Sequence, residues 1–243
     1  MSGKSIISII AVLFLSLSIT RENRAANPQQ GKEDIVSAVM ERFRPARDGN
    51  CRQFFQSIRP PRLSSAMKAL ALTYLPPDGE VMPDARSVAV LDELLPILAL
   101  HERESFVEIK LIQAAPAAVA MYARCVLLIS EQTIRLLSVH ELQALTAHEL
   151  GHEYVWGAYE SALERRDSRS MRELELWCDG VAVLTLLDLG IEPRSLVSGI
   201  SKINRYNSRF GVPQNAGDYP PDRLRSRFLR NLLVFTRKSG SIP

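Results

Sequence analysis

The feature that most constrains the fold is a long stretch without proline, from Val139 to Tyr159. Ser138 and Glu141 at its start form the S-x-x-E pattern of a helix N-terminal capping box. Apolar side chains recur at roughly helical spacing, at Val139, Leu142, Leu145, Ala147, Leu150 and Tyr154. Gly151 lowers helix stability by about 1 kcal/mol relative to alanine, which predicts close approach of another backbone or of a substrate there. The stretch predicts a helix that is buried on at least one side.

This helix carries the sequence His-Glu-Leu-Gly-His from His148 to His152, which is the HExxH pattern. Residues four apart lie on the same face of a helix, so both imidazoles can present a ring nitrogen to one ion. Zinc is the expected metal, and a catalytic zinc site takes a third protein ligand and one water molecule. Glu149 lies beside the ion and is the candidate general base, because a carboxylate there can take a proton from the attacking water.

A third ligand is expected on a second helix, where Glu173 and Glu175 are both available. Glu175 is the candidate ligand. Glu173 is expected to be a solvent-facing acid in the first turn of that helix. Asp179 lies one turn after Glu175 on the same face, where it can accept the free ring N–H of a ligating histidine and fix its tautomer.

The HELGH sequence followed by Glu175-x-x-x-Asp179-x-x-Ala182 resembles the gluzincin metallopeptidases, which include the CAAX prenyl protease, HtpX and the periplasmic BepA and LoiP types. The resemblance spans about residues 84–232 and implies a protease core without added modules. In that family the glutamate of E-x-x-x-D is the third zinc ligand, which favours Glu175 over Glu173. It therefore implies one zinc ion (Zn2+) per chain, with Asp179 as a partner of the ligands.

Near the C-terminus the chain departs from this family. The family's H-P-x-x-x-x-R pattern is represented by Tyr219-Pro220 and Arg225, with tyrosine in place of histidine. A phenol can still donate a hydrogen bond to a developing oxyanion, so Tyr219 either keeps that role or only packs under the Pro-Pro turn. Arg225 is expected to contact Asp179, the substrate or the C-terminal helix.

The N-terminus predicts a targeting segment over residues 1–26, with Lys4 followed by an apolar run from Ile6 to Ile19. Such a run is shorter than the about 20 residues of a membrane span and suits the core of a signal peptide. An uncleaved N-terminal anchor is the alternative. We therefore expect an exported protein, either periplasmic or anchored to the membrane and facing the periplasm.

The rest of the chain predicts an α+β fold: a mainly helical, zincin-like metallopeptidase core with a small β-sheet beside the HExxH helix. Residues 27–83 are expected to form a helical N-terminal extension and residues 84–243 the zinc metallopeptidase core. Besides the motif helix, helices are predicted over residues 33–43, 64–75, 84–100, 168–189 and 193–208 and near the C-terminus, and strands over 106–112 and 126–130. The helix over residues 84–100 is either continuous or kinked at Pro96. The second strand is either an edge strand that binds substrate backbone or an ordinary buried strand.

Charge and cysteine content exclude some classes of protein. A net charge of +3 is too small to indicate a nucleic-acid partner. Three cysteines are an odd count, so at least one thiol is free or pairs between chains. Cys51 and Cys125 could form a bridge in an oxidising compartment. Cys178 is either a further metal ligand or, as we favour, a small buried apolar residue.

These patterns predict a zinc-dependent endopeptidase that hydrolyses peptide bonds of exported or envelope proteins. Zinc-activated water would attack the scissile carbonyl, and Tyr219 or Arg225 would stabilise the oxyanion. The expected partner is a protein or peptide substrate, with membrane association through the N-terminal segment if that segment is retained. The alternative is a zinc-binding, chaperone-like or latched quality-control factor with weak proteolysis, which the tyrosine at position 219 favours. A structural protein with a vestigial site is disfavoured by the intact Glu149.

Overall fold

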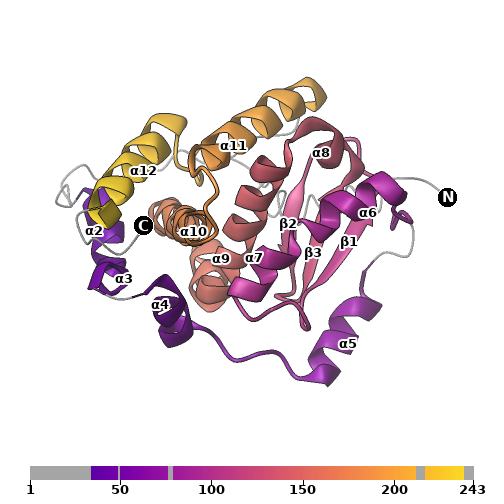
Figure 1. Ribbon diagram of the computed structural model, residues 1–243, viewed down its shortest axis with the longest axis horizontal. Coiled ribbons are helices and arrows are strands. Elements are labelled where there is room, and N and C mark those ends of the chain that lie inside the picture. Colours follow the sequence, from indigo (N-terminus) through magenta and orange to yellow (C-terminus); the bar gives the residue numbers. More distant parts are fainter. Residues whose placement is uncertain (1–33, 49, 76–78, 212–216, 238–243) are drawn as a thin grey trace.

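The computed structural model shows an α+β fold, mainly helical, with a small three-stranded sheet (Figure 1). The structure describes residues 34–48, 50–75, 79–211 and 217–237. In chain order the helices are α2 (Ile35–Arg42), α3 (Arg44–Asp48), α4 (Cys51–Ile58), α5 (Ser65–Thr73), α6 (Ala85–Asp92), α7 (Leu95–Leu100), α8 (Glu131–Leu136), α9 (Val139–Glu164), α10 (Ser168–Asp188), α11 (Arg194–Asn207) and α12 (Asp222–Arg237), with a short 3-10 helix η1 (Ser208–Phe210). The targeting segment predicted for residues 1–26 lies outside the described residues. Within the described ranges, no helix combines the length and apolar character needed to cross a membrane.

The sheet has the strand order β1-β3-β2, in which β1 (Glu108–Ile112) is parallel to β3 (Val126–Ser130). The outer strand β2 (Val119–Tyr122) runs antiparallel to β3. It was not predicted from the sequence, because it is short and lies in an alanine-rich segment without alternating polarity. Of the two alternatives for residues 126–130, the edge strand is therefore wrong and the buried strand is confirmed. These residues form the central strand, all of whose residues are buried, and β2 is the strand that packs against α9 (Figure 1).

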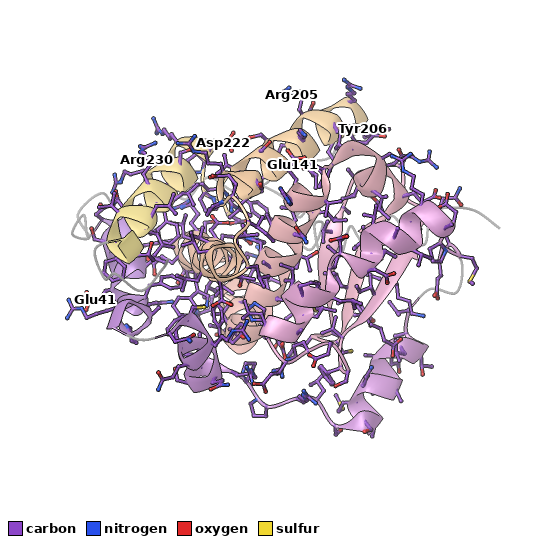
Figure 2. All side chains as sticks on the ribbon, viewed as in Figure 1. Glu41, Glu141, Arg205, Tyr206, Asp222 and Arg230 are labelled. Carbon is purple, nitrogen blue, oxygen red and sulfur yellow. The ribbon has the colours of Figure 1, made fainter. Side chains whose placement is uncertain are left out.

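The motif helix α9 begins as predicted. Ser138 Oγ accepts from the Glu141 N–H at 3.3 Å, and the Ser138 N–H donates to the Glu141 carboxylate at 2.8 Å, so the capping box is confirmed. The same carboxylate accepts hydrogen bonds from Ser198 and Lys202 on α11. Figure 2 shows Glu141 on the side of α9 that faces α11. Burial acts to raise the pKa of Glu141, but these hydrogen bonds outweigh it and lower that pKa to about 2.

The segment predicted as one helix over residues 84–100 is two helices, α6 and α7. Pro96 lies in the first turn of α7, where its missing N–H is tolerated. In a continuous helix its ring would clash with the carbonyl of Asp92, which is the last residue of α6. The predicted helices at 33–43, 64–75, 168–189 and 193–208 and near the C-terminus are confirmed as α2, α5, α10, α11 and α12.

The described part of residues 27–83 shares its hydrophobic core with the rest of the molecule. Phe43, Phe54 and Phe55 are buried in the same cluster as Trp177 of α10. The rings of Phe43 and Trp177 stack with centroids 4.5 Å apart. A Cβ atom at Gly180 would lie 2.2 Å from the Phe43 ring, so this glycine makes room for the phenylalanine. Helices α2 and α4 thus complete one face of α10.

Candidate metal centre

Two neighbouring helices bring together the three predicted ligands. His148 and His152 come from α9 and Glu175 from α10, and one donor atom of each lies within 4.8 Å of the others. The His148 Nε2 atom is 3.4 Å from Glu175 Oε2, and the His152 Nε2 atom is 3.7 Å from Glu175 Oε1. His148 and Glu175 are buried and His152 is half-buried. This group could hold a metal ion.

Close packing of the helices makes this convergence possible. A Cβ atom at Gly151 would lie 2.8 Å from the Cα atom of Cys178 on α10, closer than real Cβ contacts allow. Gly151 lies between the two histidines of α9, and Cys178 between Glu175 and Asp179. The close backbone approach predicted from Gly151 is therefore confirmed, and it occurs where the ligands face one another.

Asp179 orients His148. Its Oδ1 atom is 3.0 Å from His148 Nδ1, which leaves Nε2 of the same ring directed at Glu175. A carboxylate on one ring nitrogen fixes the tautomer in which the other nitrogen is free to bind a metal. Asp179 thus has the geometry of a partner that positions a ligand.

Arg225 of α12 contacts two acids of the centre. Its guanidinium forms an ion pair with Asp179 and another with Glu175, the latter with Nη2 3.1 Å from Oε2. Arg225 is buried, at 6% exposed, so its charge partly compensates the two buried acids. Of the contacts expected for Arg225 from the sequence, the structure shows the one with Asp179. It also shows a contact with Glu175, which the sequence did not predict.

The charges of the centre are strongly coupled. Burial acts to lower the pKa of His148, but Asp179 and Glu175 outweigh it and raise that pKa to about 10. Burial acts to raise the pKa of Glu175, but His148, His152 and Arg225 outweigh it and lower that pKa to about 2. Burial lowers the pKa of His152. Without a metal, the centre therefore holds a protonated His148 against an ionised Glu175.

Glu149 lies beside the three ligands but is not one of them. Its side chain is half-buried, and its Oε2 atom accepts a hydrogen bond from the backbone N–H of Met121 at 3.0 Å. Met121 belongs to β2, so the candidate base lies between the metal-binding group and the outer strand of the sheet.

Two tyrosines lie near the centre. The Tyr159 ring meets the His152 ring edge to face, with centroids 4.9 Å apart. Burial, with the charges of Glu175 and Glu149, raises the pKa of Tyr219 above its usual value, against a smaller opposing effect of Arg225. Burial also raises the pKa of Tyr159. Both phenols are therefore protonated donors at neutral pH.

Tyr159 was not singled out from the sequence. It lies seven residues after His152, which is two turns of a helix, so spacing alone places it on the face of the ligands.

Other predicted candidates lie outside the centre. Glu173 forms an ion pair with Arg169 at 3.0 Å, as a surface acid does. Burial, followed by the charges of Glu175 and Asp179, raises the pKa of the Cys178 thiol, which opposes the thiolate form that binds metals. The three cysteines, all within the described ranges, are free, so the predicted Cys51–Cys125 bridge is not formed.

No model of a known protein family matches the chain, and no curated protein matches it. The geometry of the centre and the sequence motifs are therefore what indicate a function for this chain.

Proposed function

We propose that this chain is a zinc-dependent metalloendopeptidase with a zincin-like core of the gluzincin type. The observation that carries the proposal is the arrangement of His148, His152 and Glu175 around one point, with Glu149 adjacent to that point and outside the ligand group. A structural zinc site has four protein ligands, whereas three ligands and a free acid are typical of a hydrolytic site.

Two of the three distances in this group are close to those of a zinc site. Metal–ligand bonds of 2.0–2.2 Å at tetrahedral angles separate two ligand atoms by roughly 3.3–3.6 Å. The corresponding separations here are 3.4 Å for His148 to Glu175 and 3.7 Å for His152 to Glu175. Two imidazoles and one carboxylate are also a donor set that catalytic zinc sites use.

Each residue of the centre has a chemical task in the proposed reaction. When bound, zinc acts as a Lewis acid and lowers the pKa of a water molecule to about 7. Glu149 takes the proton of the attacking water and delivers it to the amine that leaves. Tyr219 donates a hydrogen bond to the oxyanion that develops on the scissile carbonyl. Arg225 is engaged by Glu175 and Asp179, so we assign it to positioning these two acids.

A peptide substrate has a place beside Glu149. The outer strand β2 has only β3 as a partner strand among the described residues, and its Met121 N–H reaches Glu149. An extended peptide can add to such a strand through main-chain hydrogen bonds, which gives binding without a fixed side-chain sequence. We propose that the substrate is a protein or peptide of the cell envelope.

The proposal includes an exported location, because residues 1–26 have the pattern of a signal peptide or an N-terminal anchor. The protein would be periplasmic, or held at the membrane and facing the periplasm.

The first prediction separates metal binding from catalysis. Zinc content and casein hydrolysis are measured on the full chain and on two variants. Glu149→Gln is expected to keep about one zinc per chain and to lose at least about 100-fold in hydrolysis, because the base is removed while the ligands stay. Glu175→Ala is expected to lose both zinc and hydrolysis, because it removes a ligand.

The control is Glu173→Gln, which changes a surface acid two residues before Glu175 and should affect neither measurement. Full hydrolysis by Glu149→Gln would contradict the proposal. Zinc binding by the wild-type chain without hydrolysis would favour the chaperone-like alternative.

A further inference from the structure

Along β2 and the residues just before it, the backbone groups of successive residues point alternately toward β3 and away from it. The N–H of Ala118 donates to Ser130 Oγ and Thr133 Oγ1, and its carbonyl accepts from the Ser130 N–H at 3.0 Å. These bonds direct Ala118 toward β3. Successive residues of a strand direct their backbone groups to opposite sides. The backbone groups of Ala117, Val119 and Met121 therefore point away from β3, along the outer edge.

Asn207 occupies one end of this edge. Its Nδ2 atom donates to the Ala117 carbonyl at 2.8 Å, and its Oδ1 atom accepts from the Ala117 N–H at 2.8 Å. A residue of a neighbouring antiparallel strand would form this same pair of bonds. Asn207 is the last residue of α11, so the helix end supplies a carboxamide in place of a further strand.

Glu149 marks the other end. It accepts the Met121 N–H at 3.0 Å, which leaves Val119 as the outward-facing residue between the two side chains. Ala117 and Ala118 precede β2 directly. At about 3.4 Å per residue of extended chain, Ala117 and Met121 are roughly 14 Å apart. A bound peptide would place every second residue against Val119 and Met121.

We propose that Asn207 is a specificity-determining residue that closes the β2 edge and limits substrate pairing to about three residues on its side of Glu149. The inference rests on the proposed peptidase function and deepens it. A peptide residue opposite Met121 lies beside the base and would bond to the Met121 carbonyl, because the Met121 N–H is held by Glu149. The residue two positions further pairs with Val119. The residue two positions further again would meet Ala117, whose N–H and C=O are already bonded to Asn207.

The test measures how binding depends on peptide length. The full chain carries Glu149→Gln so that peptides stay intact, and the glutamine oxygen can still accept the Met121 N–H. Dye-labelled casein decapeptides are screened by fluorescence anisotropy, and the tightest binder is shortened one residue at a time from each end. With Asn207 present, affinity should stop rising beyond the third residue on one side of the scissile position.

In the Asn207→Ala variant, the next two residues on that side should raise affinity by about tenfold, because two backbone hydrogen bonds become available to the peptide. The matched control is Asn204→Ala, the same change one turn earlier on α11, which should leave the length dependence as it is. Asn207→Asp provides a second variant if alanine weakens folding. Its carboxylate still accepts the Ala117 N–H and frees only the carbonyl.

The possible failures are distinguishable. If peptides bind and Asn207→Ala and Asn207→Asp both show the wild-type length dependence, the role of Asn207 is overturned while the peptidase proposal stands. If no casein peptide binds or is cleaved by the wild-type chain, both are overturned. Amide hydrogen exchange gives a readout independent of activity: the Ala117 N–H should exchange faster in Asn207→Ala than in Asn204→Ala, and equal rates would count against the closed edge.

Discussion

In the metal-free centre the imidazole of His148 holds a proton. Burial alone would lower its pKa, but Asp179 and Glu175 raise it to about 10. A histidine binds metal only in its neutral form, so metal binding must release this proton. At pH values below the raised pKa of His148, each fall of one pH unit should therefore weaken zinc binding about tenfold through His148 alone. The contact between Asp179 and His148, which orients the imidazole, is therefore also expected to make metal affinity depend on pH.

We expect zinc binding at pH 7 to release about one proton from His148. Calorimetric titrations in buffers with different ionisation heats measure this number. Asp179→Asn removes the anion that raises the pKa of His148 most directly, so it should release fewer protons and also weaken zinc binding by about 10–100-fold. Glu173→Gln is the matched surface control, and an unchanged release in Asp179→Asn would contradict the assigned role of Asp179.

At the scale of elements, the centre depends on how closely α9 and α10 pack. Gly151 lets the backbone of α10 approach at Cys178, and the ligands flank this contact on both helices. The N-terminal end of α9 is held separately, by the bonds of Glu141 to its own cap and to α11. The distance between the two helices therefore sets the distance between histidines and glutamate.

We expect Gly151→Ala to lower the free energy of unfolding by about 1–2 kcal/mol. Overpacking against Cys178 costs about 1–3 kcal/mol, and the better helix propensity of alanine offsets up to about 1 kcal/mol. Urea unfolding measures the change, and zinc affinity should also fall because the helices move apart.

Gly157→Ala is the matched control on the same helix. A Cβ atom at Gly157 meets nothing within 4 Å, so this variant should be more stable by up to about 1 kcal/mol. Equal stabilisation by Gly151→Ala and Gly157→Ala would contradict the role of Gly151 in the close packing of α9 and α10.

At the scale of the whole molecule, the N-terminal helices and the helices that carry the centre share one core. Phe43 follows α2 directly and fills the space beside Gly180 on α10. Asp34 also forms an ion pair with Arg227 of α12, and Arg52 with Asp188 of α10 at 3.1 Å. The described residues of 27–83 should therefore unfold together with α9 and α10.

We expect Phe43→Ala to destabilise the protein by about 3–5 kcal/mol, because it leaves a cavity against Trp177. Fluorescence of the tryptophans and far-UV circular dichroism should follow one unfolding transition. The control is Phe210→Ala, since Phe210 is 47% exposed. A separate early transition that leaves zinc binding intact would show that residues 27–83 form an independent unit.

The sequence by itself determined the features that depend on neighbours a few residues away. The capping box of Ser138 and Glu141, the helix that follows it and the common face of His148 and His152 all result from contacts within one or two turns. The effect of Pro96 is local in the same sense, because a proline ring acts on the carbonyl four residues earlier. The sequence predicted at most a kink there, whereas the structure has two helices.

Only the tertiary structure decided which distant groups meet. Nothing local separates β2 from an alanine-rich link, and its place outside β3 follows from pairing between strands. The bond of Asn207 to Ala117 and that of Arg225 to Glu175 join residues 90 and 50 positions apart. The rotation of α10 about its axis buries Glu175 and leaves Glu173 with a surface arginine. Such contacts depend on how whole elements pack, and packing is the joint result of many side chains rather than of any short pattern.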